Sequence, residues 1–298
     1  MRVLISGSTG FIGNALVARL EVLGHEPVRL VRASPPDDRP AVRWDPLAGT
    51  IDDGAFDNVD AVVHLAGESI ASSRWTRAQK ARILDSRVAG TTTLAGAVAA
   101  ADVPPSVFLS GSAIGYYGDC GDRIVDESTG PADDFAARVS VAWEDAARVA
   151  ESDATRLAFL RTGIVLDPSG GALAEQLPFF RLGLGGRIGS GRQWFSWISL
   201  RDEVEAIIHL LTHDVSGAVN LTAPNPVTNA TFTRALGAAL RRPTLLPTPK
   251  PALWAKLGRE LSRTLLERGA RVHPSVLTES GYTFLDPELE PALEAMLD

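Results

Sequence analysis

Cysteine and tyrosine are scarce in this sequence of 298 residues, which contains one cysteine and three tyrosines. The single cysteine, Cys120, excludes an intrachain disulfide and a zinc site built from several cysteines. The longest apolar stretches, such as Leu94–Ala101, are too short to cross a bilayer. The formal net charge of −7 argues against a bulk attraction to nucleic acid or to anionic lipid. We therefore expect a globular protein whose partner is a small molecule.

The amino-terminal segment favours an intracellular protein. Met1 and Arg2 lead directly into a predicted strand, without the separate hydrophobic segment and cleavage site of a signal peptide. One cysteine also provides no disulfide framework of the kind that secreted domains use. We therefore expect a cytoplasmic location.

The first half of the chain alternates short β-branched runs with amphipathic stretches, which is typical of a parallel sheet covered by helices. The expected strands span Arg2–Ser6, Pro27–Val31, Val42–Trp44, Ala61–Leu65, Ser106–Ser110, Arg156–Thr162 and Ala218–Leu221. The expected helices span Ile12–Leu23, Arg77–Ala101, Phe135–Glu151 and Arg201–His213, and a surface loop is expected at Ser34–Asp38. This order predicts an α/β fold with a doubly wound parallel sheet.

The pattern of the sequence changes after Asp167. Glycines at 170–171 and between 183 and 191, and prolines between 243 and 251, interrupt the regular alternation. We predict a Rossmann domain in residues 1–167, which residues 199–225 rejoin through one more strand. Residues 168–198 and 226–298 are then expected to form a smaller C-terminal lobe.

The strongest motif is a glycine-rich turn between the first expected strand and the first expected helix. It has a G-x-x-G-x-x-G spacing and consists of Gly7, Ser8, Thr9, Gly10, Phe11, Ile12 and Gly13. Glycine lets the backbone turn tightly and approach a pyrophosphate, which the unpaired N–H groups at a helix N-terminus can bind. A turn without a ligand is the alternative. The strand before the motif and the helix and strand after it favour a dinucleotide site.

The second expected strand indicates which dinucleotide is bound. NAD enzymes carry an acidic residue about 20 residues after the glycines, where it binds the ribose hydroxyls. This sequence has Arg32 there, and a planar guanidinium suits the 2′-phosphate of NADP(H), a solvated charge being the alternative. Asp45 is a candidate adenine contact, with a simple turn as the alternative. The segment Leu65, Ala66 and Gly67 would let the backbone approach the cofactor's ribose.

Five further stretches carry a family resemblance. They are Leu65–Ile70, Ile83–Arg87, Ser110–Gly118, Arg161–Leu166 and Gly189–Trp194. Together with the glycine turn they resemble the extended short-chain dehydrogenase/reductase superfamily, and more closely its branch of epimerase family proteins. The resemblance spans nearly the whole chain, and the C-terminal part is similar to that branch's domain of unknown function. It implies a Rossmann fold, NAD(P) as the cofactor, and epimerase or oxidoreductase chemistry.

The resemblance also implies catalytic positions that this sequence does not fill. The superfamily uses an asparagine, a serine and a Tyr-x-x-x-Lys pair, in which the tyrosine is the general acid or base. Ser112 matches the serine, whereas Arg87 occupies the asparagine position. Ala136 and Ser140 occupy the tyrosine and lysine positions. None of the three tyrosines is followed by a lysine at the required spacing, so the pair is absent.

Proton transfer would therefore need another acid or base within hydrogen-bond reach of the substrate. The candidates are Ser112 to polarise the reacting oxygen, Tyr116 and Tyr117 as proton donors, Arg87 to replace the lysine charge, and Glu68 as a base. We expect them at the C-terminal edge of the sheet, where ligands bind in such folds. The alternatives are a packing role for Tyr116, the usual loop sequence of the superfamily for Tyr117, and a structural pair or phosphate contacts for Arg87 and Glu68.

Two histidines have the spacing of a metal site. His209 and His213 stand four residues apart on one expected helix. No third ligand is evident, and the helix is amphipathic, so we expect no metal ion.

Two functions fit these observations. The first is an NADP-dependent oxidoreductase or epimerase that acts on a small polar substrate such as a nucleotide-linked sugar. The second is a protein that binds NADP(H) without turning it over, as a redox sensor or interaction protein. Ser112 favours the first function, and the lost Tyr–Lys pair favours the second. Either a monomer or a homodimer is compatible with the expected helices.

Overall fold

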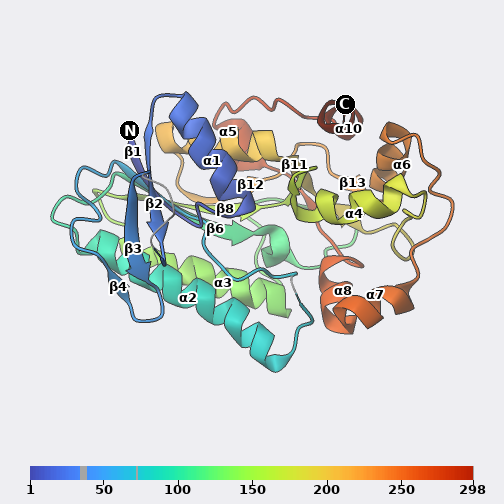
Figure 1. Cartoon of the computed structure of the whole chain (residues 1–298), viewed down its shortest axis with the longest axis horizontal. Helices are drawn as coiled ribbons and strands as arrows, with labels where there is room; N and C mark the ends of the chain where they lie inside the picture. The colour runs from blue at the N-terminus through green and yellow to red at the C-terminus, as the bar shows by residue number, and fades with distance from the viewer. Residues whose placement is uncertain (34–38, 72, 298) are drawn as a thin grey trace.

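An eight-stranded sheet forms the centre of the structure, a computed structural model that describes residues 1–33, 39–71 and 73–297 (Figure 1). In spatial order the strands are β12 (Gly217–Leu221), β8 (Arg156–Thr162), β6 (Val107–Ala113), β5 (Ala61–His64), β1 (Arg2–Ser6), β2 (Glu26–Val31), β3 (Ala41–Asp45) and β4 (Thr50–Ile51). Neighbouring strands are parallel except β4, which pairs antiparallel with β3. The chain builds outward from β1 in both directions, so the sheet is doubly wound.

Helices cover both faces of this sheet (Figure 1). On one face lie α1 (Phe11–Val22) and α5 (Leu200–Thr212), and on the other lie α2 (Arg77–Ala99) and α3 (Phe135–Ala147). In β1, Val3 and Ile5 pack in the core on the α1 and α5 face, while Leu4 packs in the core on the α2 face. Successive side chains of a strand point to opposite faces, so a strand covered on both sides is a continuous hydrophobic run.

Short polar side chains start three of these helices. Thr76, Asp134 and Ser199 each accept a hydrogen bond from a backbone N–H in the first turn of α2, α3 and α5. The helix α1 differs, because the residue before its first turn is Gly10, which has no side chain to cap it. Its first N–H groups are therefore left without the partner that a cap provides.

The chain leaves the large sheet at Gly163. The strand β8 ends at Thr162, and the next strand, β9 (Ile164–Asp167), pairs with β11 (Trp197–Ser199) in a separate two-stranded sheet. A Cβ on Gly163 would lie 2.8 Å from the carbonyl oxygen of Ser196. Only glycine allows this close approach of the two backbones.

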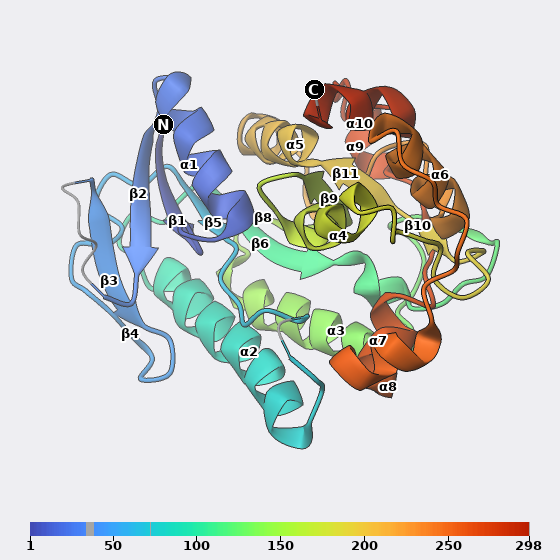
Figure 2. The same cartoon turned by 45° about the vertical axis from the view of Figure 1, so that its right-hand side comes forward.

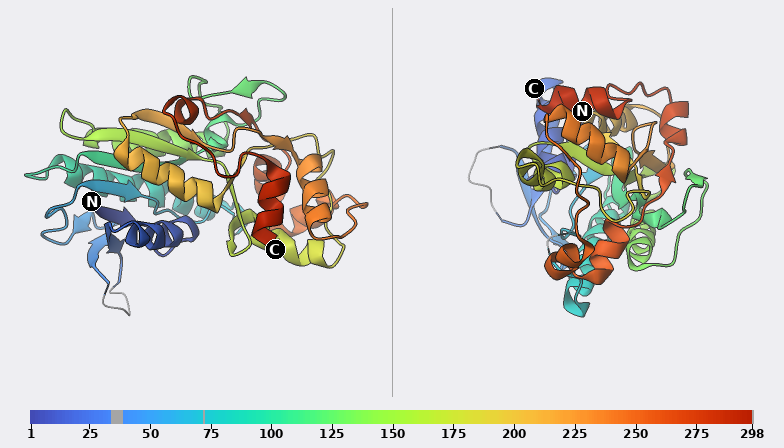
Figure 3. Two further views of the ribbon diagram at one scale, coloured as in Figure 1. Left: turned by 90° about the horizontal axis from the view of Figure 1, so that it is seen from above. Right: turned by 90° about the vertical axis from the view of Figure 1, so that its right-hand side faces the viewer.

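A smaller lobe continues from this crossing (Figures 2 and 3). Its helices are α4 (Gly171–Arg181), α6 (Asn229–Ala239), α7 (Lys250–Leu257), α8 (Arg259–Leu265) and α10 (Leu289–Leu297), while α9 (Ser275–Glu279) packs against β12. Two pairs of short strands join distant segments: β10 (Trp194–Phe195) with β13 (Val227–Thr228), and β7 (Ile124–Val125) with β14 (Arg271–Val272). A hydrophobic cluster that includes Phe180, Trp197 and Phe232 holds the lobe together. Figure 2 shows α8 beside α3, where Leu261 shares a cluster with Val139.

The structure confirms the predicted fold class, a doubly wound parallel sheet of the Rossmann type. The strand expected near Ala218 is β12, at the sheet edge beside β8. The helix expected over Phe135–Glu151 is shorter, because α3 ends at Ala147 and a 3-10 turn follows over Arg148–Ala150. The limits of the two predicted domains stay predictions. The loop expected at Ser34–Asp38 lies outside the described residues.

Candidate functional site

The glycine turn brings β1, α1 and the segment after β5 into close contact. Gly7 has φ +70°, and a Cβ on it would lie 2.8 Å from the backbone nitrogen of Ala66. A Cβ on Gly13 would collide with the carbonyl oxygen of Gly7. The Ser6 hydroxyl accepts a hydrogen bond from the N–H of Ala66 at 3.3 Å. The packing of the turn therefore requires glycine at both positions.

The outer side of the turn is open and suited to an anion. Thr9 and Gly10 are exposed, and α1 starts at Gly10 without a side-chain cap. The free N–H groups and the positive end of the helix dipole both favour a negative charge. The Ser8 hydroxyl is buried and has no hydrogen-bond partner within the described part of the chain. These features fit a bound diphosphate.

The other predicted cofactor residues fall into two groups. Leu65, Ala66 and Gly67 follow β5, and the first two of them contact the glycine turn. Phe11 and Ile12 are half-buried, and the Phe11 ring packs on the backbone at residues 170–171. Arg32 is exposed directly after β2. One oxygen of Asp45, Oδ1, accepts two backbone N–H groups of the next turn, at 2.9 and 3.0 Å, which is the turn given as the alternative, and the adenine contact stays a prediction.

His64 connects the strand that leads into the glycine turn to its neighbours, a role that no sequence motif indicates. Its Nδ1 lies 2.6 Å from the Ser6 hydroxyl, and its Nε2 lies 2.9 Å from the Thr91 hydroxyl. Burial lowers the pKa of His64 to about 3, and the nearby charge of Arg87 adds to this effect. The neutral ring therefore ties the end of β5 to β1 and to α2.

A cavity of ≈ 380 Å³ is lined by residues at the C-terminal edge of the sheet and by residues of the lobe. Its wall includes Arg87 of α2, Ala113 of β6, Ala136, Ser140 and Trp143 of α3, Thr162 of β8, and Gln176, Trp194 and Phe195 of the lobe. A Cβ on Gly111 would lie 2.6 Å from the Trp143 ring, so glycine in β6 makes room for this indole. A ligand in the cavity would touch both parts of the molecule.

Ser112 and Tyr117 belong to a buried polar network and not to the cavity wall. The Ser112 hydroxyl donates to Glu144 at 2.7 Å, and the Tyr117 hydroxyl donates to Asn220 at 2.7 Å. Arg161 connects the two ends, because it donates to both oxygens of Glu144 at 2.8 and 2.9 Å and to the Tyr117 hydroxyl at 3.0 Å. All five side chains are buried.

This network gives Ser112 and the two tyrosines partners within the protein, and their catalytic roles stay predictions. Ser112 is engaged with a carboxylate, and the next residue of the strand, Ala113, lines the cavity in its place because side chains alternate. Burial raises the pKa of Tyr117 to about 12. The guanidinium of Arg161 lies 3.5 Å from the centre of the Tyr116 ring, so this tyrosine packs against the network.

Arg87 does line the cavity, whereas Glu68 faces a neighbouring helix side chain. The guanidinium of Arg87 donates to the carbonyl oxygens of Glu68 and Ile83 at 2.9 and 3.1 Å and lies 4.8 Å from the Trp143 ring centre. Burial lowers the pKa of Arg87 to about 10. The Glu68 carboxylate accepts from Gln79 at 3.3 Å. The two residues are thus linked through the backbone carbonyl of Glu68, and their catalytic roles stay predictions.

Sequence reasoning missed one pair of polar residues. Thr162 lines the cavity and its hydroxyl donates to Glu203 of α5 at 2.8 Å. Glu203 is 0% exposed, and burial raises its pKa to about 8. The pair is separated by 41 residues in the sequence, and no local motif signals the contact.

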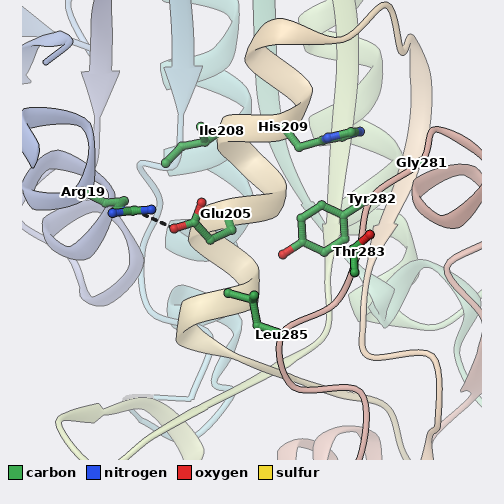
Figure 4. A pocket seen from close by; sticks show the side chains of 8 residues that line it. All are labelled: Arg19, Glu205, Ile208, His209, Gly281, Tyr282, Thr283 and Leu285. Carbon is green, nitrogen blue, oxygen red and sulfur yellow. Dashed lines mark hydrogen bonds and ion pairs between the residues drawn. The ribbon is translucent and has the colours of Figure 1, made fainter. Parts of the chain in front are cut away.

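A second hollow of ≈ 350 Å³ lies over α5 and shares no lining residue with the cavity (Figure 4). Arg19 and Glu205 form an ion pair on one side of it, and His209 and Tyr282 stand on the other. The rings of His209 and His213 stack with centres 3.7 Å apart. Within residues 1–33, 39–71 and 73–297, no group of three or more side chains is arranged to hold a metal ion.

None of the helices in the described part of the chain has the length and apolar character needed to span a membrane. The cytoplasmic location stays a prediction.

Comparison with known proteins identifies the family. Residues 3–222 match the NAD dependent epimerase/dehydratase family, and residues 248–296 match a domain of unknown function, DUF1731. The chain is 45% identical over 283 residues to an epimerase family protein of Mycobacterium bovis, which covers 95% of this chain and 93% of that protein. It is 39% identical over 301 residues to the human epimerase family protein SDR39U1, covering 100% of both.

Solved structures point to the same family. The crystal structure of human epimerase family protein SDR39U1 with NADPH has a TM-score of 0.93 and 37% identity, and covers 100% of this chain and 99% of that chain. A nucleoside-diphosphate sugar epimerase from Corynebacterium glutamicum has a TM-score of 0.81 and 33% identity, and covers 100% of this chain and 58% of that chain. The resemblance found in the sequence is confirmed, and the chain belongs to the NAD dependent epimerase/dehydratase family, in the branch with a DUF1731 domain.

Proposed function

We propose that this protein binds NADP(H) at the glycine turn and acts as an oxidoreductase or epimerase on a small substrate in the cavity. The position of the cavity carries the proposal. The ends of β6 and β8 line it, at the same sheet edge where the glycine turn follows β1. In doubly wound sheets ligands bind at this edge. The human relative crystallised with NADPH supports the same cofactor here.

The chain's own residues fit this cofactor. The uncapped N-terminus of α1 and the unpaired Ser8 hydroxyl would hold the diphosphate, and Arg32 would pair with the 2′-phosphate. When bound, the nicotinamide supplies hydride exchange with a substrate carbon. Arg87 contributes a positive charge to the cavity wall. The lobe closes the cavity from the other side and limits the access of water.

The cavity wall narrows the substrate class. Asp134 caps α3 and Arg87 bonds two carbonyls, which leaves Arg268, in an exposed ion pair with Asp119 at 3.7 Å, as the one other cation among the described wall residues. Much of the remaining wall is apolar, with Trp143 and Phe195 among its side chains. A sugar diphosphate is usually bound by several cations, more than this wall offers. The geometry therefore favours a compact uncharged carbonyl or hydroxyl compound over a nucleotide-linked sugar.

Replacing Arg32 with alanine is expected to weaken NADPH binding about 10- to 100-fold and to leave NADH binding unchanged. The lost interaction is a charge-assisted contact with a phosphate, worth about 1.5–3 kcal/mol. Isothermal titration with both cofactors measures the effect. Arg181, an exposed arginine of α4 in the lobe, is the matched control for loss of one positive charge. Equal weakening of NADPH and NADH binding would contradict the phosphate contact.

A turnover screen in deuterated water tests catalysis directly. The protein, loaded with NADPH or NADP+, is mixed with a small-molecule extract and followed by mass spectrometry, which also detects an epimerase that recycles its cofactor. We expect at least one metabolite to change mass. The control is Gly10→Asp: φ of −77° is allowed for any residue, a Cβ would lie 3.1 Å from the Gly7 carbonyl oxygen, which must shift slightly, and the carboxylate would repel the diphosphate. A mass change that persists in this variant would speak against cofactor-dependent turnover.

A non-catalytic NADP(H)-binding protein, such as a redox sensor, is the second candidate. The observation in its favour is the presence of Ala136 and Ser140 in the cavity wall, where the superfamily keeps its tyrosine and lysine. This function predicts that no metabolite changes mass in the turnover screen although NADPH is bound. It also predicts that NADPH and NADP+ bind with different affinities. Assembly as a monomer or a homodimer stays a prediction.

A further inference from the structure

Thr162 and Glu203 form a buried polar pair that has no role in the proposed function so far. Thr162 ends β8 and lines the cavity, and its hydroxyl lies 2.8 Å from Oε1 of Glu203. Glu203 stands in the first turns of α5 and is 0% exposed. Its other oxygen, Oε2, is buried and has no hydrogen-bond partner among the described residues. An ionised carboxylate here would leave one oxygen without solvation.

The charged groups around α5 do not compensate a carboxylate at Glu203. Arg19 of α1 donates to Glu205 at 2.6 Å. Because Glu203 and Glu205 are two residues apart on α5, their carboxylates lie on opposite sides of the helix, away from each other. Asp167 of β9 accepts from the backbone of its own turn at 2.8 Å. The strands β6 and β11 carry no charged residue.

Three further titratable groups, Asp202, Tyr282 and Arg161, lie near the pair, and each has a partner of its own. Asp202 accepts from the Tyr282 hydroxyl at 2.7 Å. Arg161, next to Thr162 in β8, is bound to Glu144. Burial therefore dominates and raises the pKa of Glu203 to about 8, although the hydrogen bond from Thr162 opposes part of the rise. At neutral pH the side chain carries a proton.

The described cavity wall offers no comparable acid at the positions where the superfamily has its tyrosine and lysine. Ala136 has no polar atom in its side chain, and the Ser140 hydroxyl donates to the carbonyl oxygen of Ala136 at 3.2 Å. The Asp134 carboxylate accepts from the backbone at the start of α3. Thr162 lines the same cavity from the end of β8, with Glu203 behind it as its hydrogen-bond partner.

From this geometry we propose that Glu203 stores a proton beneath the cavity and that the Thr162 hydroxyl passes it to a substrate oxygen. The proposal rests on the proposed function. As Oγ1 of Thr162 gives its hydrogen to the substrate oxygen, it accepts the hydrogen of the Glu203 carboxyl group. One proton leaves Glu203 and one O–H bond forms on the substrate. This proton neutralises the oxygen of a carbonyl whose carbon has accepted a hydride.

The same contact restores the starting state. The carboxylate that remains on Glu203 is stabilised by the positive end of the α5 dipole and by the hydrogen bond from Thr162. After the product leaves, water in the cavity returns a proton through the threonine hydroxyl. In the opposite direction of the reaction, Glu203 acts as the base by the same route. Thr162 is the residue that touches substrate, and Glu203 acts through it.

Infrared spectroscopy tests the pair without a substrate. A protonated carboxyl group has a carbonyl band that an ionised or amide side chain lacks. In the NADPH-bound protein we expect such a band to disappear as the pH rises through about 8, to be missing in Glu203→Gln, and to persist in Glu205→Gln. On transfer to deuterated water the band should shift as its proton exchanges. Thr162→Val, which keeps the shape but removes the hydroxyl, should slow that shift several-fold and raise the titration midpoint.

The results separate this proposal from the proposed function. A missing band, or a band that Glu203→Gln retains, overturns the proton store. An unchanged exchange rate and midpoint in Thr162→Val overturns the relay, whatever the turnover screen finds. Once a substrate is known, both variants should lower kcat about 100-fold with little change in NADPH affinity. The wild-type kcat for reduction should fall as pH rises through about 8, while that of Glu203→Gln should be flat.

Discussion

Replacing Glu144 with alanine is expected to lower the free energy of unfolding by about 3–5 kcal/mol. The change would leave Arg161, which is 4% exposed, with an uncompensated charge, since its two bonds to the carboxylate would be lost. Ser112 would lose its acceptor as well. Urea unfolding of the wild type and the variant at neutral pH measures the difference. The loss should be large because burying an unpaired charge costs far more than breaking an exposed ion pair.

The same helix supplies a matched control. Asp145 follows Glu144 and pairs with Arg148 at 3.3 Å, with side chains that are 63% and 58% exposed. Asp145→Ala should change stability by no more than about 1 kcal/mol. The double change Glu144→Leu with Arg161→Met should recover much of the loss, because it removes both charges together. Similar costs for Glu144→Ala and Asp145→Ala would mean that the buried ion pair of Glu144 and Arg161 does not stabilise the fold.

The Rossmann part of the fold could be predicted because its signals are local. Residues Val3, Leu4 and Ile5 form a continuous apolar run, which a strand buried on both faces requires. The glycine turn follows directly, and the conflict between a Cβ on Gly13 and the Gly7 carbonyl arises within one short segment. Such features depend on neighbours in the sequence, so spacing alone identifies them.

The lobe could not be predicted in the same way. Four of the short strands, β7, β10, β13 and β14, are two residues long, too short for any periodicity, and β7 at Ile124–Val125 pairs with β14 at Arg271–Val272. The helix α4 contains Pro178, a residue that normally ends helices. These elements are stabilised by contacts between distant segments, which a pattern of neighbouring residues does not encode.

The candidate site shows the same limit at the level of single side chains. The motif located Ser112 at the end of β6, but adjacent side chains of a strand point to opposite faces, so Ser112 bonds to Glu144 whereas Ala113 lines the cavity. Arg87 was recognised because the family resemblance marks its position. Glu203 was not, because its importance comes from burial and from a contact with Thr162 across 41 residues.

Between about pH 6.5 and 9, the wild type is expected to lose about 2 kcal/mol more stability than Glu203→Gln. Burial raises the pKa of Glu203 from 4.5 to about 8, so the folded protein holds a proton that the unfolded chain has already released. The stability due to this proton is present below pH 4.5 and is lost as pH rises through about 8. A glutamine amide has no proton to lose. Urea unfolding of both proteins across this range measures the two slopes.

The chosen pH range separates Glu203 from other buried groups. Burial lowers the pKa of His64 from 6.5 to about 3. This group therefore lowers the stability of the protein as pH falls below 6.5 and has almost no effect on stability above that pH. Burial also raises the pKa of Glu127, so this group lowers stability with rising pH in the same direction as Glu203. Its contribution is the same in the wild type and in Glu203→Gln, and it cancels when the slopes of the two proteins are compared. Glu205→Gln should keep the wild-type slope. If Glu203→Gln kept it too, Glu203 would hold no extra proton in the folded protein, and the relay through Thr162 would have no acid.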